Sequence, residues 1–173
     1  FISNTFLIFS IFCCIIICLV EPLTNITILN YKVLGDNFTD SLVVVPWICF
    51  AYLFHGAYVL QLPGPYITNN TKGIALIRGV GAISNIGLNF YLIPIYGILG
   101  SAYATCLSFF TMALLMFLYN QKIFPMVYNY YKICSALFLV VLFIVINFFN
   151  PSLFFRFIFI LLLPIILFLM GCI

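Results

Sequence analysis

The feature of this sequence that most constrains its fold is an uncharged run between Gly79 and Gln121. The run is roughly twice as long as the ~20 residues that one apolar helix needs to cross a bilayer, so it must fold back on itself. The strongest helix breakers inside it are Pro94 and Gly97. Proline disfavours helix in the residue before it, and glycine tolerates the backbone angles of a reversal. The run therefore predicts two membrane-spanning helices joined by a short turn.

The composition indicates that lipid is the solvent of most of the chain. Hydrophobic residues make up 66% of the 173 residues and charged residues only 5%, whereas a soluble protein has about 25% charged residues. The six basic residues stand singly along the chain, and this excludes nucleic acid as a partner, because a nucleic-acid surface needs a concentrated basic patch. The seven cysteines lie in apolar runs without CxxC spacing. We therefore expect neither a disulfide framework nor a metal site.

Apolar runs alternate with polar, turn-rich segments, which predicts an all-α polytopic membrane protein with six transmembrane helices. The first four spans belong to one unit over residues 1–119, a cytoplasmic interfacial loop follows at 120–132, and two trailing helices occupy 133–173. The predicted spans are 6–29, 42–62, 74–93, 98–119, 133–149 and 153–172. Pro22 predicts a kink in the first of them.

The basic residues predict the orientation of these spans. Four of them fall in two segments on one side of the predicted hairpin: Lys72, Arg78, Lys122 and Lys132. By the positive-inside rule that side is the cytoplasm, and both ends of the chain are then cytoplasmic. Arg156 falls on the external side and opposes the rule, but a long side chain near a helix end can snorkel outward.

The predicted hairpin also carries a family resemblance. Asn85 and Asn89 near the end of one helix are followed by Leu92-Ile93-Pro94-x-Tyr96-Gly97-Ile98-x-Gly100-Ser101-Ala102-x-Ala104-Thr105 and then by a helix that ends in an aromatic and basic loop. This pattern resembles the C-terminal half of the bacterial polysaccharide flippases. These are the Wzx-type, O-antigen or oligosaccharide, members of the multidrug/oligosaccharidyl-lipid/polysaccharide exporter superfamily. Helix number and loop placement agree with that family over residues 6–172.

The resemblance implies a function in polysaccharide biosynthesis. Such a protein moves undecaprenyl-pyrophosphate-linked oligosaccharide across the inner (cytoplasmic) membrane by alternating access between two lobes. This chain would supply most of the second lobe plus two trailing helices. The implied partners are the bilayer, the lipid-linked substrate, the N-terminal half of the same polypeptide and a polysaccharide polymerase. No catalytic residue and no bound cofactor are expected, and a proton or sodium gradient would supply the energy.

One face of the third predicted span carries candidate substrate-path residues. Arg78, Ala82, Asn85 and Asn89 advance by four, three and four residues and so share a helix face. A guanidinium can hold a phosphate through two hydrogen bonds, and amides can bond sugar hydroxyls. The alternative is that the asparagines bond neighbouring helices while Arg78 marks the membrane edge.

Three further residues are candidates for ion coupling or substrate contact. Glu21 and Asn25 lie four residues apart on one face of the first predicted span and could form a protonatable or cation-binding site. A glutamate held neutral or paired between helices is the alternative. His55 is the only histidine and could relay protons or stack against a sugar, or it could simply bond a nearby backbone group or tyrosine.

Other functions remain open at this point. A cation-coupled drug or small-molecule exporter of the same superfamily would use Glu21 for coupling, but would gain nothing from Arg78. An integral-membrane glycosyltransferase or ligase would need external carboxylates, for which Asp36 and Asp40 are the candidates. A structural membrane subunit would need no polar site at all.

Overall fold

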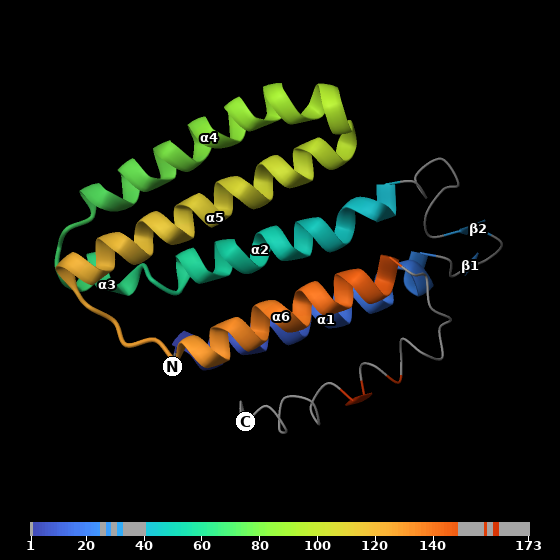
Figure 1. Ribbon diagram of the computed structural model, residues 1–173, viewed down its shortest axis with the longest axis horizontal. Coiled ribbons are helices and arrows are strands. Elements are labelled where there is room, and N and C mark those ends of the chain that lie inside the picture. The colour runs from blue at the N-terminus through green and yellow to red at the C-terminus, as the bar shows by residue number, and fades with distance from the viewer. Residues whose placement is uncertain are drawn as a thin grey trace.

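The computed structural model describes residues 2–24, 27–28, 31–32, 41–148, 158 and 161–162. Its elements are α1 Ile2–Thr24, β1 Thr27–Ile28, β2 Tyr31–Lys32, α2 Val45–Val59, α3 Pro63–Ile67, α4 Lys72–Tyr96, α5 Ile98–Ile123 and α6 Tyr130–Phe148. Figure 1 shows α4, α5 and α2 side by side, with α1 and α6 together next to α2. The described part of the chain is thus all-α apart from one very short hairpin.

Five helical segments in the described part of the chain are long and apolar enough to cross a membrane. They are residues 2–20, 41–67, 72–96, 98–123 and 130–148. The expected multi-pass arrangement is supported by these five candidate spans. The sixth predicted span, 153–172, lies outside the described residues except for 158 and 161–162, and the predicted placement of Arg156 also lies outside them.

The outward face of α4 is apolar, as expected of a helix that could span a membrane. Ile83 is 73% exposed and Phe90 is 80% exposed, although both belong to a helix with a candidate membrane span. Leaving such side chains in water forgoes about 1.5–3 kcal/mol for each. A face of this kind is stable when hydrocarbon surrounds it.

The first span differs from its prediction of 6–29. Helix α1 begins at Ile2 and ends at Thr24, with Pro22 in its last turn. Thr27 and Ile28 then pair with Tyr31 and Lys32 as an antiparallel ladder. β-branched residues such as Thr27 and Ile28 favour strands over helices, and these two residues are paired as a strand and not as part of α1.

The predicted loop 120–132 is also shorter than expected. Helix α5 runs to Ile123 and α6 begins at Tyr130, so the linker covers residues 124–129. The end of α5 follows from Pro125, because a residue before proline is pushed out of the helical region. Phe124 accordingly has φ −153° and ψ 81°.

The second span, predicted as 42–62, consists of α2, which has Pro46 in its first turn, and of α3 beyond it.

The α4–α5 hairpin has its predicted reversal, with one difference in detail. Helix α4 continues through Pro94 to Tyr96, and Gly97 makes the turn at φ +57°. The Gly97 N–H donates to the carbonyl of Ile93 at 2.8 Å. A φ of this sign suits glycine. Close packing beside the turn uses Gly100, whose Cα faces the backbone carbonyl of Leu92.

Two apolar cores share α2. One joins α1, α2 and α6 through buried residues such as Ile17, Leu53 and Phe143, and the other joins α2, α4 and α5 through Tyr58 and Met116. Helix α2 is therefore the element that connects the α4–α5 hairpin to the α1–α6 pair.

One end of the bundle carries the lysines of the described helices. Here α1, α4 and α6 begin and α2 and α5 end (Figure 1). The lysines are Lys72 at the start of α4, Lys122 in the last turn of α5 and Lys132 in the first turn of α6. We refer to this end as the basic end.

Candidate functional site

A groove of about 430 Å³ lies between α2, α4 and α5. Its space comes from small side chains, among them Ala82 of α4 and Thr105 of α5. Three of the polar residues singled out from the sequence line it: His55 of α2 and Arg78 and Asn85 of α4. The structure therefore brings together a cation, an amide and an imidazole that come from two helices.

Arg78 is held in the groove by a buried tyrosine. Its Nε donates to the hydroxyl of Tyr58 at 3.0 Å, and its guanidinium carbon lies 5.8 Å from the centre of the Tyr58 ring. Tyr58 is fully buried, whereas Arg78 is exposed. A guanidinium has five N–H donors, and within the described residues Tyr58 is the only partner found for them.

No carboxylate is described near this cation. The chain has three acidic residues, and the side chains of all three lie outside those that the structure describes. Within the described side chains, the groove therefore combines a fixed positive charge with neutral polar groups. This pattern suits an anion that forms hydrogen bonds.

The two asparagines of α4 line hollows, and one of them also links α4 to α5. Asn85 Nδ2 lies 3.5 Å from Thr105 Oγ1 of α5, and Asn89 Nδ2 donates to Asn85 Oδ1 at 3.0 Å. Asn89 does not line the groove itself. It borders a separate hollow of about 400 Å³ beside Phe90 and Pro94, and its Oδ1 is buried without a hydrogen-bond partner among the described residues.

His55 lies in an aromatic cluster at the wall of the groove. Its ring centre is 4.7 Å from that of Phe109 and 6.0 Å from those of Tyr52 and Tyr58. Tyr58 also contacts Arg78. His55 and Arg78 therefore both contact Tyr58. His55 and Tyr58 belong to α2, whereas Arg78 belongs to α4.

The side chains of the proposed coupling pair, Glu21 and Asn25, are not among those that the structure describes. Glu21 belongs to the last turn of α1, whereas the described walls of the groove come from α2, α4 and α5. Its side chain, and all of Asn25, lie outside what the structure describes. In the described side chains, no group of three or more His, Cys, Asp and Glu residues could hold a metal ion.

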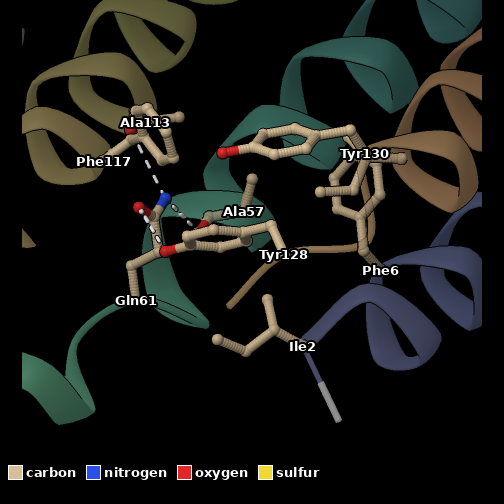
Figure 2. Close-up of a pocket in the computed structure, with 9 residues that line it drawn as sticks. Ile2, Phe6, Ala57, Gln61, Ala113, Phe117, Tyr128 and Tyr130 are labelled. Atoms are coloured by element: carbon tan, nitrogen blue, oxygen red, sulfur yellow. Dashed lines mark hydrogen bonds between the residues drawn. The ribbon is translucent and has the colours of Figure 1, made fainter. Parts of the chain in front are cut away.

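A polar junction at the basic end was not anticipated from the sequence. Gln61 is only 4% exposed, and its Nε2 donates to the carbonyl of Ala57 at 2.9 Å and to that of Ala113 at 3.3 Å. The backbone carbonyl of Gln61 accepts from Asn120 Nδ2 at 2.8 Å, and the side-chain Oε1 of Gln61 accepts from the Tyr128 hydroxyl at 3.2 Å. Figure 2 shows Gln61 between Ala113 and Tyr128.

The end of α2 explains why an amide is needed there. The backbone N–H of Gln61 donates to Tyr58 at 3.1 Å rather than to Ala57, so the last turn tightens and the Ala57 carbonyl loses its helical donor. The Gln61 side chain replaces that donor. Burial, together with the neighbouring Tyr130, raises the pKa of Tyr128 to about 12, so the hydroxyl that donates to Gln61 keeps its proton at physiological pH.

No protein-family model, no curated protein and no solved structure matches the chain.

Proposed function

We propose that the chain translocates an anionic lipid-linked oligosaccharide, of the undecaprenyl-pyrophosphate type, across the cytoplasmic membrane for polysaccharide biosynthesis. The observation that supports this is the groove in which Arg78 lies with Asn85 and His55. The guanidinium offers paired donors to a phosphate, and amide and imidazole groups offer hydrogen bonds to sugar hydroxyls. The function is thus transport and not catalysis.

The position of Arg78 supports an anionic cargo over a cationic one. A charged side chain in a membrane span costs on the order of 2.5–3.5 kcal/mol even on permissive scales, and such residues commonly mark substrate pathways. A cationic drug would be repelled by the guanidinium, and no described carboxylate offsets that charge. The alternative of a cation-coupled drug exporter is therefore the weaker one, and a membrane glycosyltransferase finds no support in this groove.

The wider assembly is part of the same proposal. The first four candidate spans would belong to one lobe and α6 would be the first trailing helix. The N-terminal half of the same polypeptide would supply the other lobe, and the groove would open to each side in turn. Glu21 and Asn25 would couple transport to a proton or sodium gradient. A polysaccharide polymerase would receive the product on the outer side.

We further propose that the basic end faces the cytoplasm, because it carries the three lysines of the long helices. A cysteine introduced for Tyr96, beside the turn at Gly97, is then expected to react with an impermeant maleimide added to intact cells. A cysteine introduced for Asn129, in the linker before α6, is expected to react only after permeabilisation. The unsubstituted chain provides the background from native cysteines. Labelling of Asn129→Cys alone in intact cells would contradict this orientation.

The transport proposal is tested by reconstituting the expressed protein into vesicles with a fluorescent undecaprenyl-pyrophosphate oligosaccharide. We expect protein-dependent movement of the labelled lipid to the opposite leaflet, measured by its accessibility to an impermeant quencher. A cationic dye in the same vesicles serves as the competing substrate. Dye transport driven by a proton or sodium gradient, without movement of the anionic lipid, would replace this proposal by the drug-exporter alternative.

A further inference from the structure

A second pocket lies at the basic end, where α1, α2, α5 and the start of α6 meet (Figure 2). Its volume is about 250 Å³, and none of its lining residues belongs to the groove around Arg78. Apolar walls come from Ile2 and Phe6 of α1, Ala57 of α2 and Phe117 of α5. Four different segments therefore enclose one apolar hollow.

The polar atoms at this pocket are largely satisfied by the protein. The amide of Gln61 bonds two backbone carbonyls and the hydroxyl of Tyr128. Figure 2 shows the rings of Tyr128 and Tyr130 extending across the hollow. Tyr130 is 61% exposed, and its hydroxyl has no hydrogen bond within the described residues. An apolar hollow that offers so few polar partners favours hydrocarbon over water.

A cation is fixed next to the segments that form the pocket. Lys132 Nζ donates to Asn4 Oδ1 at 2.9 Å, and the backbone N–H of Asn129 donates to Ser3 Oγ at 3.0 Å. These two bonds hold the first turn of α6 against the first turn of α1, which supplies Ile2 to the pocket. Lys132 is half-buried, but its bond to Asn4 is exposed, so its remaining donors can reach an anion at the membrane surface.

We propose that this pocket binds one acyl chain of an anionic phospholipid, whose phosphate lies at Lys132. Tyrosine and lysine are the side chains that anchor at the headgroup level, and basic pockets between membrane helices bind anionic headgroups. Burial of each methylene in the hollow favours binding further. This site does not depend on the transported substrate, because it requires only that the helices lie in a bilayer.

The test uses the purified protein in nanodiscs that contain phosphatidylglycerol with a photoreactive group on one acyl chain. After illumination, the modified peptides are identified by mass spectrometry. We expect modification at the pocket, on the peptides that contain Phe6 and Phe117. Phosphatidylcholine with the same acyl chain, at the same concentration, should label these peptides about fivefold less, the preference expected of one lysine near an anionic headgroup.

Two variants at the basic end separate this site from general lipid contact. Lys132→Gln should remove most of the preference for phosphatidylglycerol. Lys72→Gln makes the same charge change at the start of α4, which does not line the pocket, and should leave the preference unchanged. Ala57→Leu should fill the hollow and abolish modification there.

The result that would overturn the proposal is equal labelling by the two lipids, or labelling spread over the outward face of α4 around Phe90. Size-exclusion chromatography shows whether Ala57→Leu keeps the fold. If that variant is not monodisperse, the comparison of Lys132→Gln with Lys72→Gln decides alone, because Lys72 is exposed and Lys132 is only half-buried.

Discussion

Replacing Arg78 by alanine is expected to reduce translocation of the lipid-linked oligosaccharide roughly tenfold to a hundredfold, because hydrogen bonds to a charged group contribute ~1.5–3 kcal/mol. The loss arises because the phosphate would no longer meet a cation in the groove. The amount of protein in the membrane should not fall, since Arg78 is exposed and its one described partner is Tyr58. The measurement is the rate of lipid movement in reconstituted vesicles, normalised to protein.

Three further variants test whether the loss comes from the charge of Arg78, from its paired donors or from its contact with Tyr58. Arg78→Lys should keep part of the rate, because an ammonium supplies charge without the paired donors of a guanidinium. Tyr58→Phe removes the acceptor of the 3.0 Å hydrogen bond but keeps the ring beneath the guanidinium, so a smaller loss is expected. Lys72→Ala removes a charge outside the groove and should change little. An unchanged rate in Arg78→Ala would mean that this arginine only marks the membrane edge, and the proposed substrate path would be wrong.

Hydropathy could predict most of the helical arrangement, but the groove only in part. The four-three-four spacing within one helix places Arg78 and Asn85 on one face, and both line the groove. Asn89 shares the spacing, but one further turn along α4 carries it to a different hollow. Spacing within a helix also gives no indication of which helix lies opposite, so the contact between Arg78 and Tyr58 of α2 required the fold.

The ends of helices and the polar junction escaped prediction for a related reason. The mean hydropathy of an apolar run does not show where residues begin to favour a strand over a helix, so α1 was expected to continue beyond Thr24. Mean hydropathy also does not reveal the role of a single amide such as Gln61. Its stabilising hydrogen bonds depend on one carbonyl at the end of α2 and on partners from α5 and the linker. Such groups are specified by three-dimensional neighbours, and their sequence signal is only a lone Gln or Asn near the end of a span.

The second large effect is expected from Gly100→Ala in the α4–α5 hairpin. A Cβ at Gly100 would collide with the backbone carbonyl of Leu92 and come within 2.8 Å of the backbone nitrogen of Ile93. Backbone atoms cannot rotate away as a side-chain tip can, so the two helices must separate near their turn. Close approach at small residues is what holds membrane helices together. We expect a loss of ~1–3 kcal/mol of stability, the range for overpacked interiors.

Gly87→Ala is the matched control, because it adds the same methyl group to a helix of the same hairpin. Nothing lies within 4 Å of a Cβ at Gly87, so this change should be neutral or stabilising by up to ~1 kcal/mol through helix propensity. The measurement is the fraction of each variant that remains monodisperse in detergent after heating. If both variants survive to the same temperature, α4 and α5 do not touch at Gly100 as described, and the hairpin packing would need revision. If Gly100→Ala alone is lost, the small residue after the turn is required because two backbones meet there.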